Sequence, residues 1–405
     1  MAAKNKKSSS ELDLEQIDEN EEISEEQEEP DLKSVLSSSI TTTDWTVDTL
    51  VNQLRKGNIE LSPQFQRRFA WRDPRKSKFI ESLALNYPVP HIVLARDKKN
   101  PTKLIVLDGK QRLMTIAQFF GVKKLGEKQL DLEPLALSNL TIKKAWNKES
   151  FDSLRKKTEY KADLDLLENA TIRSVIVSTW NSEEYLYSVF VRLNLGSLPL
   201  SPQELRQALR PGEFTNFADT YSADSVGLKT VLGLSKPDFR MRDVELLIRF
   251  LGFRKRSSLY SGNLKAFLDD TCDFYNKNWS ARKAAVEKSC EEFEAGIALA
   301  IEIFGKKKVL RKHTSDGYET RINRAVFDVI SYALANSDVR DALSDPTDQE
   351  KLRVGFERLC TSPTFVKSIE STTKSISATH TRFDEFLKLV RQITKVAITT
   401  KLPAA

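Results

Sequence analysis

The chain has 405 residues, of which 30% are charged and 40% hydrophobic, and its formal net charge is +6. This length allows two or three domains with sizeable cores. No stretch approaches about 18 uninterrupted apolar residues, so we expect no membrane span. The N-terminus has no apolar signal core, so we expect a cytoplasmic protein that is not exported. The cysteines, Cys272, Cys290 and Cys360, lack metal-ligand spacing, which favours a reducing compartment and argues against structural zinc.

Charge is distributed unevenly along the chain. Residues 1–40 contain four lysines and twelve acidic residues, a balance of −8, so the remaining residues carry +14. A segment this acidic and poor in aromatic residues predicts a disordered tail. The basic remainder suits nucleic acid or nucleotides as partners, although a solvated lysine-rich surface would give the same net charge.

From about residue 45 the pattern predicts an α+β domain. A short helix is expected within 46–61. Asp73 followed by Pro74 predicts a helix start, with Asp73 as the cap and Pro74 at the first helical position, and the helix ends before Pro88. Short branched apolar runs predict strands at 91–96, 103–107 and 171–177. The segment 121–170 is polar and mixed, which predicts irregular structure with short helices.

A turn between a predicted strand and a predicted helix, Asp108 to Arg112, is the first candidate site. A helix start offers backbone N–H groups and the positive end of a dipole, which suit an anion. Gly109 permits close approach of the backbone, and Lys110 and Arg112 add positive charge. The turn is therefore a candidate phosphate site, and an ordinary strand–helix connection with surface charges is the alternative.

Two consecutive helix starts are predicted further along the chain. Asn181 with Glu184 three residues later predicts a capping box, and Ser201 with Glu204 repeats the pattern. Beyond residue 215 the pattern is nearly all helical, with amphipathic segments at 243–253, 281–305, 323–336 and 381–397. We therefore expect a tail over 1–40, an α+β domain over 41–212 and a helical domain over 213–400.

Three motifs follow one another in the predicted α+β domain: "PQFQRRFAW" at 63–71, "LDGKQRL" at 107–113 and "VFVRLNLGSLPLSPQELRQAL" at 189–209. Together they resemble the N-terminal domain family of GmrSD-type (type IV) restriction endonucleases, a prokaryotic family related to the ParB/sulfiredoxin-like fold. The resemblance is close over roughly residues 41–215. It implies a ParB/sulfiredoxin-like domain followed by a mostly helical domain, and nucleotide binding, often with NTP hydrolysis, coupled to defence against foreign or modified DNA.

The resemblance can be carried over residue by residue. In the first motif the matching residues are Gln66 and Arg67. The central motif matches Asp108, Gly109, Gln111 and Arg112, with Lys110 where glutamine is commoner, which leaves phosphate binding available but makes hydrolysis less certain. The third motif matches Phe190, Asn194, Gly196, Leu200, Glu204 and Leu205, of which we expect Asn194 to face the site and most others to be scaffold.

The chemistry of these residues suits a nucleotide. Phosphoryl transfer needs positioning and charge neutralisation more than a nucleophilic side chain. We expect Asp108, Gln111 and Arg112 to act in catalysis, with Asp108 also as an Mg²⁺ ligand, because hard cations prefer oxygen. Guanidinium groups of arginine can grip phosphate in a bidentate manner. The residues expected to bind the NTP are Gln66, Arg67, Gly109, Lys110 and Asn194.

Restriction proteins of this class commonly carry a His-Asn-His nuclease domain, which needs a histidine base beside metal ligands. The chain has three histidines, and neither His313 nor His380 has a second one near it in sequence. We interpret both as surface or capping residues and expect no such nuclease. The basic segment 253–260, with its interleaved aromatic residues, and the lysines at 306–308 are modest hints of DNA contact.

Our leading hypothesis from the sequence is an NTP-binding sensor or regulator of a prokaryotic restriction or defence-type system. NTP hydrolysis is part of this hypothesis, with DNA and a separate nuclease or effector subunit as candidate partners. The second hypothesis is a non-enzymatic DNA-binding or interaction module that retains the fold. The third is a ParB-like nuclease that uses Asp108 and a metal ion.

Overall fold

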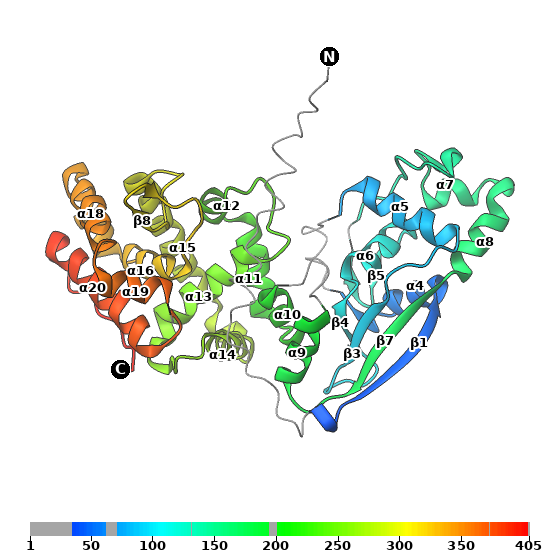
Figure 1. Ribbon diagram of the computed structural model, residues 1–405, viewed down its shortest axis with the longest axis horizontal. Coiled ribbons are helices and arrows are strands. Elements are labelled where there is room, and N and C mark those ends of the chain that lie inside the picture. Colours follow the sequence, from blue (N-terminus) through cyan, green and yellow to red (C-terminus); the bar gives the residue numbers. More distant parts are fainter. Residues whose placement is uncertain (1–34, 62–70, 131, 194–200, 372, 404–405) are drawn as a thin grey trace, which may run out of the picture. The chain divides into compact units, whose positions relative to one another are not determined.

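The computed structural model describes residues 35–61, 71–130, 132–193, 201–371 and 373–403 (Figure 1). The chain divides into two compact units, Met1–Ala208 and Leu209–Ala405. The first unit contains a five-stranded mixed sheet with helices, and the described part of the second unit is mostly helical. The predicted α+β fold class is therefore confirmed. Most of the predicted acidic tail lies outside the described residues.

The sheet of the first unit has the strand order β1-β7-β3-β4-β2 (Figure 1). Antiparallel pairs join β1 to β7 and β3 to β4, and parallel pairs join β3 to β7 and β2 to β4. The strands predicted at 91–96, 103–107 and 171–177 are all present. The strand bounds are Ser39–Thr46 (β1), Ile59–Glu60 (β2), Ile92–Arg96 (β3), Leu104–Asp108 (β4) and Thr171–Thr179 (β7).

The edge strand β1 was not predicted, and the folded region therefore begins before residue 45. Most residues of its sequence, "SITTTDWT", are exposed. The strand therefore lacks the alternation of buried apolar and exposed polar residues by which a strand is predicted. The strand is stabilised by pairing with β7, with Ser39 Oγ 2.7 Å from Thr179 Oγ1 and Arg173 in an ion pair with Asp44. These contacts join residues more than a hundred positions apart, so local pattern could not indicate them.

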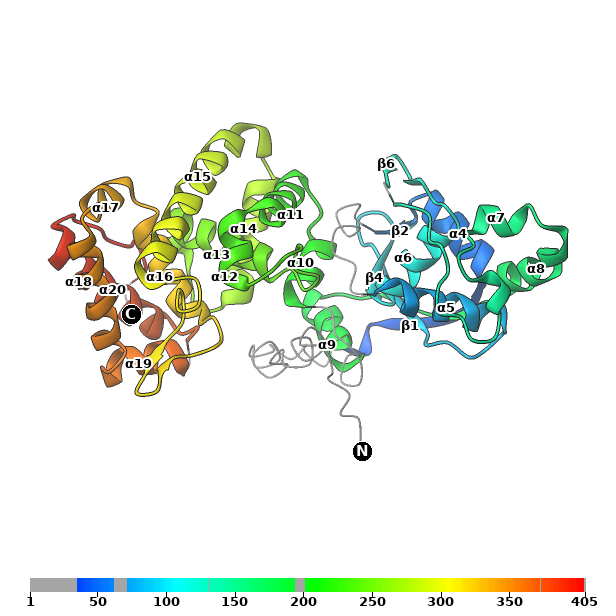
Figure 2. The same ribbon diagram turned by 90° about the horizontal axis from the view of Figure 1, so that it is seen from above.

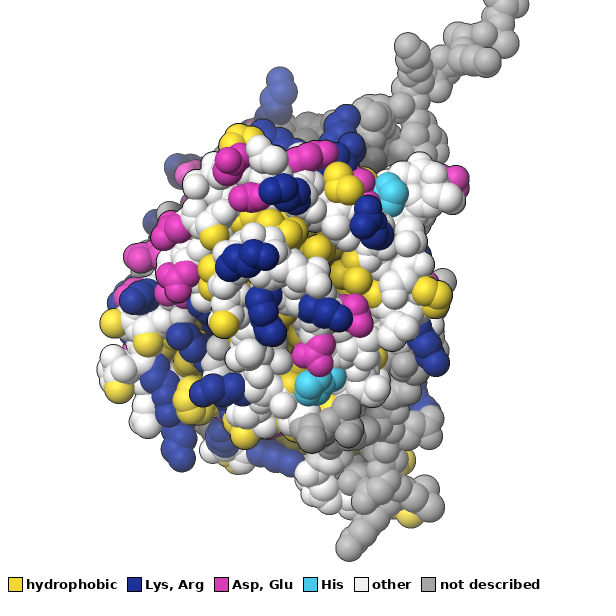
Figure 3. Space-filling view, turned by 90° about the vertical axis from the view of Figure 1, so that its left-hand side faces the viewer, with side chains coloured by type: hydrophobic (Ala, Val, Ile, Leu, Met, Phe, Trp, Pro, Cys, Tyr) yellow, Lys and Arg dark blue, Asp and Glu magenta, His cyan; other side chains and the backbone are white. Residues whose placement is uncertain are grey.

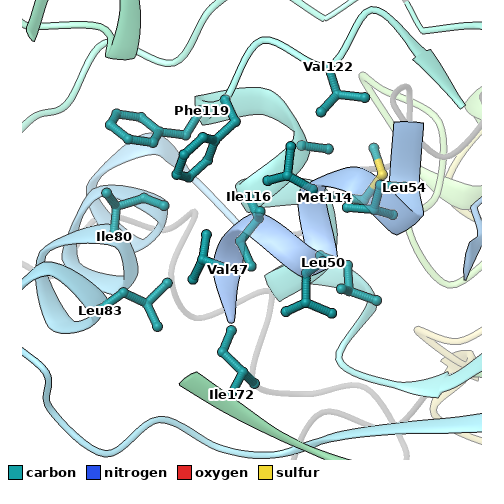
Figure 4. Close-up of a cluster of buried hydrophobic side chains, with 14 of the residues drawn as sticks. Val47, Leu50, Leu54, Ile80, Leu83, Met114, Ile116, Phe119, Val122 and Ile172 are labelled. Carbon is teal, nitrogen blue, oxygen red and sulfur yellow. The ribbon is translucent and has the colours of Figure 1, made fainter. Parts of the chain in front are cut away.

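Three helices cover the core of the first unit: α4 (Val47–Arg55), α5 (Asp73–Ala84) and α6 (Lys110–Phe119). Figure 4 shows apolar side chains of these helices meeting, including Leu50 of α4, Ile80 of α5 and Ile116 of α6, which are all 0% exposed. Each fully buried side chain of this size contributes about 1.5–3 kcal/mol to folding. The apolar positions that predicted the helices are thus the ones that form the core.

The segment 121–170 is irregular with short elements, as predicted. It contains a small hairpin and two short helices, with 3₁₀ turns between them. The bounds are Lys124–Leu125 (β5), Lys128–Gln129 (β6), Lys144–Trp146 (η2), Phe151–Arg155 (α7), Thr158–Tyr160 (η3) and Lys161–Asn169 (α8).

Two of the predicted caps differ in detail from the structure. Helix α5 begins at Asp73 itself, with Arg72 as the N-cap and Pro74 one position further in. Helix α9 (Glu183–Leu193) is capped by Ser182, whose Oγ accepts the N–H of Tyr185 at 3.2 Å. The prediction of Asn181 as this cap was wrong, because its side-chain amide donates instead to Ser37 Oγ at 2.6 Å.

The described part of the second unit is built from helices and one short hairpin (Figure 2). All four amphipathic segments predicted beyond residue 215 coincide with helices. Helix α10 (Pro202–Leu209) reaches the border between the units. The helix bounds are Glu213–Asp224 (α11), Val226–Leu232 (α12), Arg242–Arg256 (α13), Leu264–Asn276 (α14), Trp279–Phe304 (α15), Arg324–Leu334 (α16), Ser337–Ala342 (α17), Pro346–Leu359 (α18), Pro363–Glu370 (α19) and Ile376–Thr394 (α20). The 3₁₀ turn η4 spans Ser257–Leu259, and the hairpin strands span His313–Thr314 (β8) and Gly317–Tyr318 (β9).

A buried charge cluster connects three helices of the second unit. Asp328 of α16 accepts two hydrogen bonds from Arg249 of α13, at 3.0 and 2.7 Å, and one from Arg382 of α20 at 3.1 Å. All three residues are at most 4% exposed. Because removal of one partner from a buried ion pair leaves an uncompensated charge, the cluster fixes how these helices pack.

Two further features concern membrane-spanning helices and cysteines. Within the described part of the chain, we find no helix with the length and hydrophobicity needed to cross a bilayer. Cys272, Cys290 and Cys360 are free thiols, and all three are buried.

Candidate functional site

The predicted strand–turn–helix is present at Asp108 to Arg112. Strand β4 ends at Asp108, helix α6 begins at Lys110, and Gly109 between them is the N-cap with φ +93° and ψ +10°. A Cβ atom on Gly109 would lie 2.5 Å from Cγ2 of Ile92. Glycine is therefore required here twice, for its left-handed backbone and for the close contact with β3.

The side chain of Arg112 is held against this turn. Its Nη2 donates to Oδ2 of Asp108 at 2.6 Å and to the backbone carbonyl of His91 at 2.9 Å. The Arg112 side chain is 12% exposed and that of Asp108 is 30% exposed. The Nε of Arg112 is buried and has no hydrogen-bond acceptor among the described residues. A buried charged donor without an acceptor costs about 1–3 kcal/mol or more, so an anion bound here would relieve a real penalty.

The start of α6 adds backbone donors to this guanidinium. The first N–H groups of a helix have no acceptor within the helix, and they carry the positive end of its dipole. The N–H of Leu113 is already bonded to the carbonyl of Gly109. The donors that helix geometry leaves for an anion are therefore those of the turn that precedes Leu113, next to Arg112.

Lys110 forms a buried ion pair, and its expected role in nucleotide binding stays a prediction. Its Nζ lies 2.9 Å from Oε1 of Glu204 on α10, and both side chains are only 6% exposed. Glu204 also accepts the N–H of Ser201 at 2.9 Å and donates its own N–H to Ser201 Oγ at 3.1 Å, which confirms the predicted capping box. The ion pair thus connects the start of α6 to the start of α10. Arg112 is the other positively charged residue of the Asp108–Arg112 turn, and it takes no part in this ion pair.

Gln111 joins the central motif to the end of the first motif. Its Oε1 accepts the backbone N–H of Trp71 over 3.4 Å, which is a long hydrogen bond. The Trp71 ring packs edge-on against Phe79, and the guanidinium of Arg75 lies 4.8 Å from the ring centroid. Two motifs separated by about forty residues therefore meet at this turn.

Several predicted site residues lie outside the described residues. They are Gln66 and Arg67 of the first motif, and Asn194, Gly196 and Leu200 of the third. Leu205 is 2% exposed and forms part of the core, as expected for scaffold. The described part of the site therefore consists of the central motif together with Glu204.

The donor set fits magnesium only in a limited way. One carboxylate oxygen of Asp108 is occupied by Arg112. Over the described ranges, no group of three or more histidine, cysteine or acidic residues gathers to hold a metal ion. Magnesium is commonly bound by one or two carboxylates together with substrate phosphates and waters. Asp108 fits that role with a single ligand, so the ion would be one that arrives with the nucleotide.

Two contacts of the site were not predicted. The partner of Lys110 is Glu204, which the sequence identified only as half of a capping box. A buried lysine needs an acid, but the sequence does not say which of many acids lies near it. The second contact is the carbonyl of His91 on Arg112, and a backbone acceptor leaves no signal in the sequence.

The basic segment 253–260 does not offer the aromatic surface that we expected. Phe253 and Tyr260 are each 1% exposed and belong to the core. Arg254 pairs with Glu292 at 3.3 Å, whereas Lys255 is exposed. These two rings are therefore not available to stack on bases, and DNA contact through the segment stays a prediction.

The other lysines and histidines singled out in the sequence lie in the second unit, and DNA contact through the lysines stays a prediction. Lys306, Lys307 and Lys308 are exposed after the end of α15. His380 lies 2.9 Å from Asp384 one turn later on α20, and the ring of His313 packs edge-on against Tyr318. Figure 3 shows one face of the structure, where lysine and arginine side chains are interspersed with acidic and apolar ones.

Comparison with known families matches residues 47–210 to the model described as the GmrSD restriction endonuclease N-terminal domain. The match runs from the start of α4 to the residue after α10, and it includes the whole Asp108–Arg112 turn. The resemblance predicted from the three motifs is thereby confirmed. Comparisons with curated proteins and with solved structures give no match.

Proposed function

We propose that this chain, a restriction or defence-system protein by virtue of the GmrSD N-terminal domain at residues 47–210, binds a nucleoside triphosphate at the Asp108–Arg112 turn. The observation that supports this most is the guanidinium of Arg112. It is held at a helix start by Asp108 and the carbonyl of His91, and its buried Nε has no acceptor among the described residues.

The physical chemistry of the turn suits a phosphate group. A negative charge at a helix N-terminus gains about 0.3–1 kcal/mol, and up to about 2 kcal/mol when it is partly buried. A hydrogen bond to a charged group contributes about 1.5–3 kcal/mol. Gly109 supplies the left-handed backbone that turns the chain into α6, and its lack of a side chain leaves room for Ile92 and for the guanidinium of Arg112. These terms together are sufficient for a phosphate anchor.

Hydrolysis is a further part of the proposal. Gln111 is the residue that we assign to orienting the attacking water, because its bond to the backbone of Trp71 is long and easily exchanged. Asp108 orients Arg112 and would supply one oxygen to a magnesium ion bound with the nucleotide, which neutralises phosphate charge. The protein would then act as a sensor or regulator, with DNA and a separate nuclease or effector subunit as its proposed partners.

Binding without turnover is the second candidate function. It is favoured by the buried ion pair of Lys110 with Glu204, because the lysine that replaces the commoner glutamine is committed to holding α10. In that case the chain would retain the nucleotide or DNA as a ligand and act as a binding module.

The test compares nucleotide binding by the wild type, Arg112→Ala and the matched control Arg173→Ala. Arg173 also lies in the first unit and pairs with one aspartate, Asp44, but its side chain is 68% exposed on the sheet edge. Calorimetric titration with ATP, GTP and CTP should show binding that Arg112→Ala weakens about 10- to 100-fold. The control should stay within about twofold of the wild type, since surface ion pairs contribute little.

Turnover is then measured with Mg²⁺, with and without DNA. Hydrolysis that is lost in Gln111→Ala while binding persists would support the catalytic role of Gln111. Binding without hydrolysis in the wild type would favour the second candidate function. A folded wild-type protein that binds none of the three nucleotides at millimolar concentration would refute both nucleotide proposals.

A further inference from the structure

Three helices of the second unit meet around a partly exposed phenylalanine. Phe274 of α14 is 38% exposed. The guanidinium carbon of Arg256, the last residue of α13, lies 4.4 Å from the ring centroid, and that of Arg282, in the first turn of α15, lies 3.6 Å from it. Both distances are within the range of cation–π contact. We call these three residues the arginine pair cluster.

In the described part of the chain, neither arginine of this cluster forms an ion pair with a carboxylate, although the charge of Asp270 acts on Arg256. Arg256 donates to the backbone carbonyl of Asp270, and Arg282 donates to the backbone carbonyl of Phe274. Among the described residues, no carboxylate oxygen forms an ion pair with either guanidinium. Their neighbours differ in this respect, because Arg254 pairs with Glu292 and Arg210 pairs with Asp273. The cluster thus carries two positive charges that the described chain leaves unbalanced at contact distance.

Helix electrostatics does not account for this arrangement. Arg256 sits at the end of α13, where a positive charge interacts favourably with the dipole, but Arg282 lies in the first turn of α15, where it does not. Burial lowers the pKa of Arg256, and the charge of Arg282 lowers it further, while the charge of Asp270 raises it. Two like charges held on one ring cost stability, and such a local conflict commonly marks a functional site.

We propose that the arginine pair cluster, Arg256, Phe274 and Arg282, binds the phosphate backbone of duplex DNA. The ring and the two backbone carbonyls fix the guanidinium groups, so each can present its remaining N–H donors to phosphate oxygens. The exposed lysines Lys255 and Lys277 are next to the cluster in sequence and extend its positive charge. DNA is the fitting polyanion because residues 47–210 match the GmrSD restriction endonuclease N-terminal domain, and this choice rests on the DNA partner of the proposed function.

This contact would not distinguish one DNA base sequence from another. Phosphate contacts position a protein on DNA, whereas base contacts specify the sequence. The cluster would therefore act as a sequence-independent anchor for the second unit. All of its residues lie in the unit that does not contain the Asp108–Arg112 turn, so its test needs no nucleotide.

The experiment measures binding of the full chain to a fluorescent 30-base-pair duplex by anisotropy over a series of salt concentrations. Arg256→Gln and Arg282→Gln remove the charges but retain polar side chains of moderate length over Phe274. Each phosphate contact contributes about 0.9 to the magnitude of the slope of log affinity against log salt concentration. The contact therefore changes the affinity by about eightfold for each tenfold change in salt concentration. We expect each single variant to lose about one unit of slope and the double variant to lose about two.

Arg254→Gln is the matched control. It removes a positive charge from the same turn of α13, but Glu292 already pairs with that charge. Its affinity should stay within about twofold of the wild type, and thermal unfolding should show that all variants are folded. Wild-type affinity and salt slope in the folded double variant would overturn the proposal. Failure of the wild type to bind duplex DNA at 50 mM salt, or binding to anionic lipid vesicles instead, would overturn it too.

Discussion

Replacement of Gly109 by alanine tests the geometry on which the candidate site depends. The residue has φ +93°, a left-handed conformation that costs a non-glycine residue about 1–2 kcal/mol. The new Cβ would also lie 2.5 Å from Cγ2 of Ile92, so the core must shift, at about 1–3 kcal/mol for overpacking. The smaller entropy of the unfolded alanine chain returns only about 0.4–1 kcal/mol. We therefore expect Gly109→Ala to lower the free energy of unfolding by about 3 kcal/mol.

Gly121 provides the control for the backbone term. It has φ +59° beyond the other end of α6, but a Cβ there would meet no atom within 4 Å. Gly121→Ala should therefore cost only about 1 kcal/mol, because the steric term is absent. The difference between the two variants isolates the contact with Ile92.

The assay is urea unfolding followed by tryptophan fluorescence. Four of the five tryptophans, at positions 45, 71, 146 and 180, lie in the first unit, so the signal reports mainly on that unit. A double-mutant cycle with Ile92→Ala removes the clashing Cγ2 and should recover about 2 kcal/mol of coupling. A Gly109→Ala variant no less stable than Gly121→Ala would refute the reasoning, and so would the absence of coupling with Ile92.

Three further predictions concern buried charges and thiols. Glu204→Gln should cost about 3 kcal/mol in the free energy of unfolding of the first unit, because it removes a carboxylate charge 2.9 Å from the buried ammonium of Lys110. Lys110→Gln added to it should restore most of that loss, and additive losses in urea unfolding would contradict this. Asp328→Ala should cost about 3–5 kcal/mol, because it leaves Arg249 and Arg382 buried side by side, and a thermal midpoint within 2 °C of the wild type would exclude that role. Burial raises the pKa of Cys290 to about 12, so native alkylation at pH 8 should be far slower than in urea. As the pH rises, the thiol of the unfolded chain loses its proton near pH 8.5, before the thiol of the folded chain does. The free energy of unfolding should therefore fall between about pH 8.5 and 12. A Cys290→Ala variant should lack this contribution.

The sequence alone was sufficient for features that depend on near neighbours. The strand–glycine–helix turn at 108–112, the capping box of Ser201 with Glu204 and the long amphipathic helices of the second unit were all predicted. Each depends on spacings of three or four residues, or on the conformational freedom of one glycine, and these are written in the local sequence. The three motifs were likewise sufficient to indicate the domain family that matches residues 47–210.

Only the tertiary structure decided which distant residues meet. The edge strand β1 was invisible to pattern because its side chains are largely exposed and its stability comes from β7. Lys110 bonds to Glu204, ninety-four positions away, a partner that the sequence did not indicate. A buried charge takes the nearest acid in space, and spatial neighbours are set by how the helices and the sheet pack rather than by distance along the chain.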